Sequence, residues 1–178
     1  MRFTGTITIV LISCLFAVSC KAGRISSLQT MKDTGIIAES RLSTRISNNQ
    51  SFAVVPVYRT EGVRYAAQRK YMLYLVDPSL ERMPDGVYEV YVTSSKPVIK
   101  DLRSSSKSFA DVLDLYMITP GKAAGLNITR SLQNLAARKG IPARFWVTII
   151  FRGNQLPGNK VSKETGLLNC RSIVIEAK

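Results

Sequence analysis

Few residues of this 178-residue chain could carry acid–base or nucleophilic chemistry. The chain contains no histidine, which removes imidazole general bases, Ser-His-Asp and Cys-His sites, and every metal site built on histidine. Beyond residue 20 the only cysteine is Cys170, and one thiolate cannot form a metal cluster. We therefore expect neither a metal site nor a cofactor.

Carboxylates are the remaining catalytic candidates, and Asp111 with Asp114 is the nearest pair. A spacing of three on a strand places their side chains on opposite faces, so the pair does not converge without a bulge. Residues 104–107 satisfy the S-x-x-K pattern, but the other elements of penicillin-recognising enzymes are misplaced, and a serine-rich turn explains the string better. We name no catalytic residue and expect a protein that is not an enzyme.

The segment "RFWVTIIFR" carries the best candidate binding residues. Its alternation assigns Phe145, Val147, Ile149 and Phe151 to a buried face of a strand. The opposite face bears Arg144, Trp146 and Arg152, and an arginine beside an indole can stack on a sugar or hold an anion. The simpler alternative is that a neighbouring loop half-covers Trp146.

Short runs of β-branched and aromatic residues predict the elements that must position these side chains. They cover residues 51–59, 70–77, 86–94, 109–118 and 167–176, and turn residues separate them. One helix is expected at about 127–139, with Asn127 as N-cap and Gly140 followed by Pro142 as the stop. The pattern predicts a mainly β fold, an antiparallel β-sandwich with one short helix.

The N-terminus predicts export. Arg2 precedes an apolar run at 7–18 that is too short and too interrupted to span a membrane comfortably. The run closes with Ala17-Val18-Ser19-Cys20, which resembles a bacterial lipobox. We expect a signal peptide at 1–19, lipidation of Cys20, a polar tether at 20–51 and a single β-sandwich domain at 52–178. The alternative is an ordinary signal peptide cut near Cys20.

The charge balance restricts the partners. The formal net charge is +13, and removal of residues 1–19 takes away only Arg2. Such an excess favours lipid head groups, lipopolysaccharide, acidic glycans or an acidic partner protein. The basic residues are dispersed and form no DNA-binding motif, so nucleic acid is not an expected partner. Lys21 after the lipidated cysteine is compatible with sorting to the outer membrane.

The second half of the chain resembles a known domain. The order of "VYEVY" (87–91), "SFADVLDLY" (108–116), the helix, "VTIIFR" (147–152) and "IVIE" (173–176) is similar to the C-terminal β-sandwich domain of polyphenol oxidases and tyrosinase-like proteins, with its K-F-D-V-type motif. In that family the copper sites belong to a separate histidine-rich domain, over which the C-terminal domain packs. The resemblance implies a fold and a docking habit, and it carries over no catalytic residue.

These observations together predict a non-catalytic, lipid-anchored lipoprotein of the bacterial cell envelope. Its expected role is that of an accessory module, which docks one sheet face or a set of end loops onto an envelope protein. The alternative is a binding module for anionic glycan or lipopolysaccharide that uses Arg144, Trp146 and Arg152. An enzyme that uses only carboxylates would require two acidic groups from different strands to converge in one cleft.

Overall fold

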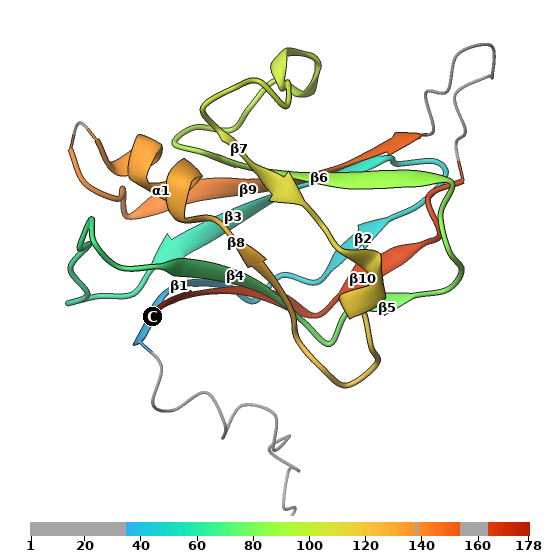
Figure 1. The fold of residues 1–178 in the computed structure, drawn as a ribbon, viewed down its shortest axis with the longest axis horizontal. Helices are drawn as coiled ribbons and strands as arrows, with labels where there is room; N and C mark the ends of the chain where they lie inside the picture. The colour runs from blue at the N-terminus through green and yellow to red at the C-terminus, as the bar shows by residue number, and fades with distance from the viewer. Residues whose placement is uncertain (1–34, 138, 154–163) are drawn as a thin grey trace, which may run out of the picture.

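The computed structural model describes residues 35–137, 139–153 and 164–178. Within these ranges the chain forms strands joined by turns, with one α-helix and two 3₁₀ turns (Figure 1). The elements in chain order are β1 (Gly35–Ser40), β2 (Thr44–Ile46), β3 (Phe52–Arg59), β4 (Tyr71–Val76), β5 (Ser79–Leu80), β6 (Gly86–Thr93), η2 (Ile99–Asp101), β7 (Phe109–Val112), η3 (Leu115–Met117), β8 (Ala124–Asn127), α1 (Thr129–Ala136), β9 (Arg144–Gly153), β10 (Leu168–Cys170) and β11 (Ser172–Ala177).

Eight strands form one large antiparallel sheet in the order β7-β6-β9-β3-β1-β11-β4-β8. The short strands β2, β10 and β5 form a second, three-stranded sheet. The ten-residue strand β9 pairs with β3 on one side and with β6 on the other. Strand β1 lies between β3 and β11 and so joins the two halves of the large sheet.

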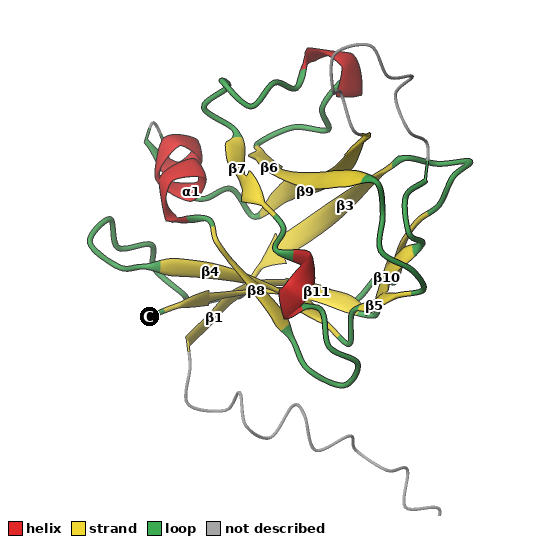
Figure 2. Ribbon diagram, turned by 45° about the vertical axis from the view of Figure 1, so that its right-hand side comes forward, coloured by secondary structure: helices red, strands yellow, loops and turns green. Residues whose placement is uncertain are grey.

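The large sheet curls, so that β6, β9 and β3 lie above β4, β1 and β11 (Figure 1). The two edge strands, β7 and β8, contact each other on the open side. Helix α1 packs against β6, β7 and β4 and closes one end of the space between the layers (Figure 2). The predicted fold class, a mainly β, sandwich-like structure with one helix, is therefore confirmed.

Alternating side chains fill the space between the layers. Phe145, Val147, Ile149 and Phe151 of β9 are all buried in this core, which confirms the predicted inner face. Cys170 of β10 also belongs to the core and is only 4 % exposed. Burial raises the pKa of the Cys170 thiol to about 11, so the side chain acts as a small buried hydrophobe, as the sequence suggests.

Helix α1 is shorter than the predicted interval, and its cap is displaced by one residue. The residue before the first helical turn is Ile128, which makes no side-chain capping bond. Asn127 nevertheless helps to cap the helix, because its Oδ1 accepts from the backbone N–H of Thr129 at 3.1 Å and from the Thr129 hydroxyl at 2.7 Å. Gly140, with a φ of 73°, lies beyond the helix and donates to the carbonyl of Ala136 at 2.9 Å. This is the glycine stop that the sequence predicts.

The ordered domain begins before residue 52, so the predicted limit of the polar tether is wrong. Strand β1 lies inside the large sheet, where Ile37 is 3 % and Ala38 is 0 % exposed, and β2 pairs with β10. Backbone hydrogen bonds to strands on both sides hold β1, so it needs few apolar residues of its own. Residues 20–34 of the predicted tether lie outside the described residues.

Candidate functional site

The outer face of β9 carries the three predicted binding residues, and the structure brings two of them together. Arg144 is exposed and Trp146 is half-buried. The guanidinium carbon of Arg144 lies 5.6 Å from the centroid of the indole ring, a cation–π arrangement. Trp146 lies opposite Pro56 of β3 and Thr93 of β6 in the sheet. The two residues form an exposed basic and aromatic strip at the start of β9.

A loop covers the middle of the same face. This cover loop, residues 94–108, leaves β6 and returns as β7. A second buried cluster joins this loop to the sheet and consists of Tyr91, Leu102 and Ile150. Partly buried side chains pack around it, namely Phe52, Ile99 and Phe109. The rings of Tyr91 and Phe109 meet edge to face, with centroids 5.5 Å apart. Apolar packing therefore fixes the cover loop on the sheet.

Arg152, at the far end of β9, ties the cover loop to the sheet. Its Nε donates to Oε2 of Glu89 at 2.7 Å, and its Nη2 donates to the carbonyl of Leu102 at 3.0 Å. The Tyr91 hydroxyl donates to the same Glu89 oxygen at 2.6 Å. Burial alone would lower the pKa of Arg152, but its interactions with the Glu89 carboxylate and the Tyr91 hydroxyl outweigh burial and raise that pKa. Arg152 is thus a charged group in a defined position.

The structure does not bring Arg152 together with Arg144 and Trp146. Trp146 and Arg152 are six positions apart, which corresponds to about 20 Å along an extended strand. The covered residues Thr148 and Ile150, 0 % and 3 % exposed, lie between them. The predicted strip is consequently two separate places on the surface, one at each end of β9.

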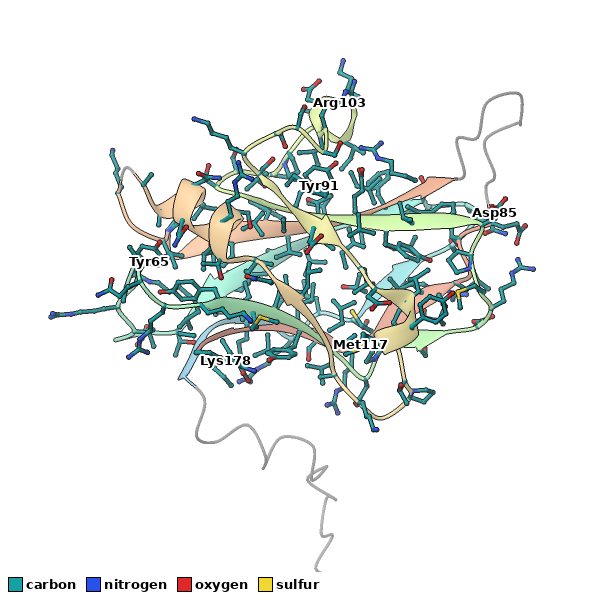
Figure 3. The ribbon with its side chains drawn as sticks, viewed as in Figure 1. Tyr65, Asp85, Tyr91, Arg103, Met117 and Lys178 are labelled. Carbon is teal, nitrogen blue, oxygen red and sulfur yellow. The ribbon has the colours of Figure 1, made fainter. Side chains whose placement is uncertain are left out.

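A cavity of about 510 Å³ opens beside Arg152. Its lining combines β6, β9 and the cover loop and consists of Val87, Glu89, Arg103, Ser104, Arg152 and Gly153. Figure 3 shows Arg103 on the loop, above Tyr91. Sequence reasoning missed Glu89 and Arg103 as members of a site. Only the register of β6 against β9 places Glu89 beside Arg152, and only the folded cover loop brings Arg103 there.

A second groove, of about 550 Å³, lies between the end of β6 and α1. Lys107, Ser108 and Asn134 contribute to its lining, and the Asn134 amide donates to the carbonyl of Lys107 at 3.0 Å. No carboxylate is among the described residues that line it. The S-x-x-K string thus lies partly beside a polar groove in which no acidic group could act as a general base.

The two candidate catalytic carboxylates, those of Asp111 and Asp114, accept hydrogen bonds from nearby backbone N–H groups. Oδ1 of Asp111 accepts from the N–H of Val112 at 2.8 Å, and Oδ1 of Asp114 accepts from the N–H of Tyr116 at 3.0 Å. Both aspartates are exposed. Within the described ranges, no group of three or more His, Cys, Asp and Glu side chains could hold a metal ion.

The turn after β7 exposes large apolar side chains. Tyr116 is 87 % exposed and Met117 is 56 % exposed, while Val112 at the end of β7 is 38 % exposed. We name residues 112–117 the docking turn, after the role that we propose for them. The apolar sequence "VLDLYM" gave no sign of this exposure, because alternation alone does not tell an edge strand from a projecting turn.

The predicted signal peptide, residues 1–19, and the predicted lipidation site, Cys20, lie outside the described residues. In the part of the chain that the structure describes, no helix has the length and apolar content needed to cross a membrane.

Comparison with known proteins yields a likeness of fold only. No protein family matches the sequence, and no curated protein matches it. Among solved structures, the chain is similar to a latent aurone synthase, a polyphenol oxidase from a natural source, at 14 % sequence identity and a TM-score of 0.47. The alignment covers 76 % of this chain and 26 % of that one, so this chain spans about a quarter of the length of that enzyme.

Proposed function

We propose that this chain is a non-catalytic, lipid-anchored lipoprotein of the bacterial envelope that docks onto a protein partner through the docking turn. The exposure of consecutive Tyr116 and Met117 carries the proposal. Single exposed apolar residues are common on protein surfaces, but tyrosine is among the residues that dominate binding energy at interfaces. Two neighbouring large side chains on one turn therefore make a suitable anchor for a partner's pocket.

The docking turn is held rigidly, which favours binding. Leu113 is 3 % exposed, and its N–H donates to the carbonyl of Tyr88 at 2.8 Å. The Asp114 side chain caps the turn, and Leu115 and Ile118 pack against the core. Little conformational freedom remains to be lost on association, so more of the contact energy contributes to affinity.

Charge and tether define the expected partner. A chain of formal net charge +13 favours an acidic surface around the partner's apolar pocket. A lipid on Cys20 would keep the domain at the outer membrane and raise its effective concentration near other envelope proteins. We further propose that residues 86–176 are a divergent relative of the polyphenol oxidase C-terminal domain.

Site-specific photo-crosslinking in the bacterial envelope tests the docking turn. A photoreactive phenylalanine analogue replaces Tyr116 in one chain and Tyr58, a 51 % exposed tyrosine of β3, in the control. We expect one defined cross-linked envelope protein from position 116 and none from position 58. The double variant Tyr116→Ala/Met117→Ala should then bind that purified partner on the order of tenfold more weakly. Equal crosslinking from both positions, or unchanged affinity of the double variant, contradicts the proposal.

Membrane fractionation and intact mass test the anchor separately. The native chain should carry a diacylglycerol-derived mass at Cys20 and sediment with membranes, whereas Cys20→Ala should not. Release of the unmodified native chain into the soluble fraction would remove the anchor from the proposal and leave the docking turn to be judged on its own.

The stacked pair at the start of β9 supports a second candidate function, the binding of an anionic glycan. Trp146 is the only tryptophan of the chain, so intrinsic fluorescence reports directly on this place. An acidic oligosaccharide should shift the emission of the native chain, and Arg144→Gln should reduce the shift. The effect should weaken with added salt, because exposed charges are screened. Unchanged emission in the presence of the oligosaccharide rules out this candidate.

A further inference from the structure

The cavity at the far end of β9 has the chemistry of an oxyanion site. Arg103 and Arg152 line the same cavity of about 510 Å³, together with Ser104 and Glu89. Both guanidinium groups donate to the carbonyl of Leu102, so they lie close to each other. The cavity falls within the size range of small-ligand pockets, about 300–1,000 Å³. It is larger than an inorganic anion needs, and Val87, which is 43 % exposed, supplies an apolar wall for an attached organic group.

The position of Arg152 is fixed before any ligand arrives. Glu89 and the carbonyl of Leu102 together accept two of the five guanidinium N–H donors of Arg152. Glu89 is held in turn by the Tyr91 hydroxyl. Fixed donors lose little freedom when they bind an anion, and the remaining donors of Arg152 are available to a ligand in the cavity.

Arg103, on the cover loop, completes the pair. Its Nη1 donates to the carbonyls of Lys100 and Leu102 at 2.6 and 3.1 Å, which secures the side chain to the cover loop. Within the described residues, none of its bonds is to a carboxylate. Its charge is therefore not neutralised by an ion pair, whereas the charge of Arg152 is balanced by Glu89.

We propose that this cavity binds the phosphoryl group of a small organic phosphate or of a phospholipid head group. The donors of Arg103, Arg152 and Ser104 exceed what one carboxylate, with about four lone-pair sites, can accept. A tetrahedral phosphoryl group presents more oxygen atoms, and planar guanidinium groups bind it bidentately. The inference goes beyond docking, since it uses residues on another part of the surface.

Isothermal titration of the full-length purified chain with inorganic phosphate and with a sugar 1-phosphate tests the site, with acetate as a carboxylate probe. Arg103→Gln removes the guanidinium group of an exposed side chain and should weaken phosphate binding on the order of tenfold. Arg152→Gln should weaken it at least as much. Arg64→Gln is the matched control, because it removes the same charge from an exposed position between β3 and β4 and should leave the affinity unchanged.

Further readouts keep the proposal falsifiable if Arg152→Gln does not fold. In ¹⁵N-labelled protein, phosphate should move the amide signals of Ser104 and Gly153 and leave those around Trp146 in place. Equal weakening by Arg103→Gln and Arg64→Gln would show a diffuse charge effect and overturn the site. The proposal would also be overturned if acetate bound as tightly as phosphate does. It would be overturned as well if the chain bound none of the three phosphate sources, namely inorganic phosphate, the sugar 1-phosphate and anionic vesicles.

Vesicles distinguish the two sources of the phosphoryl group. If the ligand is a lipid, the Cys20→Ala chain, which lacks the proposed anchor, should bind vesicles that contain phosphatidylglycerol, should not bind phosphatidylcholine vesicles, and should lose the binding when Arg103→Gln is added. If the ligand is a soluble phosphate, the sugar phosphate should bind and the vesicles should not. Vesicle binding that Arg103→Gln leaves unchanged assigns the membrane contact to other residues and overturns the lipid source.

Discussion

The buried thiol of Cys170 makes the stability of this protein depend on alkaline pH. Desolvation raises the thiol pKa from 9.0 to about 11 in the folded state. The folded chain therefore keeps the thiol proton longer than the unfolded chain does. The stabilisation is fully present below pH 9, and it is lost as the pH rises from 9 through 11.

The magnitude follows from the two pKa values. A shift from 9.0 to about 11 corresponds to a loss of roughly 3 kcal/mol above pH 11, and about half of that loss is reached at pH 10. Tyr88, whose pKa burial raises to about 12, adds to the same trend. Its contribution cancels when the native chain is compared with Cys170→Ala, because both proteins contain it.

The assay is denaturation by guanidinium chloride at pH 7, 8, 9 and 10 under reducing conditions, followed by the fluorescence of Trp146. A chain expressed from Lys21 contains Cys170 as its only cysteine. At pH 7 Cys170→Ala should be less stable by roughly 1–2 kcal/mol, because sulfur packing is lost. This difference should shrink by roughly 1 kcal/mol at pH 10. A difference that stays constant over this range would show that the thiol is not desolvated and would refute the reasoning.

Three further changes test the packing of the fold. Phe145→Ala, at a fully buried position, should lower the free energy of unfolding by about 3–5 kcal/mol, and a loss below 1 kcal/mol in chemical denaturation would contradict the core assignment. Tyr88→Phe removes the hydroxyl that donates to the buried carbonyl of Thr165 and should cost about 1–2 kcal/mol in the same assay. Gly86→Ala should lower the melting temperature by several degrees, since the glycine φ is 151° and a Cβ there would lie 2.3 Å from a carbonyl oxygen of β9. The control is Gly35→Ala, which has open space around it and should change the melting temperature much less.

The sequence predicted correctly those strands and helix ends that depend on neighbouring residues alone. The alternation of β9 assigned its inner residues correctly, because the period of a strand depends on consecutive residues alone. The glycine stop of α1 is equally local. Strand β1 was missed because its burial depends on pairing with strands elsewhere in the chain. These partners are β11, near the C-terminus, and β3, which follows β2. Its own residues, with Glu39 and Ser40 beside two buried apolar ones, form no clear pattern.

The sites depend even more on distant pairing. Arg152 meets Glu89 across 63 positions of sequence, and the contact exists only because Val87 lies opposite Arg152 in the ladder. A shift of one residue in this register would point Glu89 to the other face of the sheet. No reading of either strand alone could supply that register. Charge composition pointed to anionic ligands, but the fold alone decides which arginines share a cavity.

The division of the outer face of β9 has a consequence for how anions of different length should bind. Phosphate fits the cavity at Arg152 and should leave the fluorescence of Trp146 unchanged. A short acidic sugar stacked at Trp146 should leave the amide signal of Gly153 unchanged. Only a ligand able to extend over about 20 Å, across the cover loop, could perturb both ends. A short ligand that moved both signals would show that the cover loop transmits a change along β9, and the two ends could then no longer be treated as independent places.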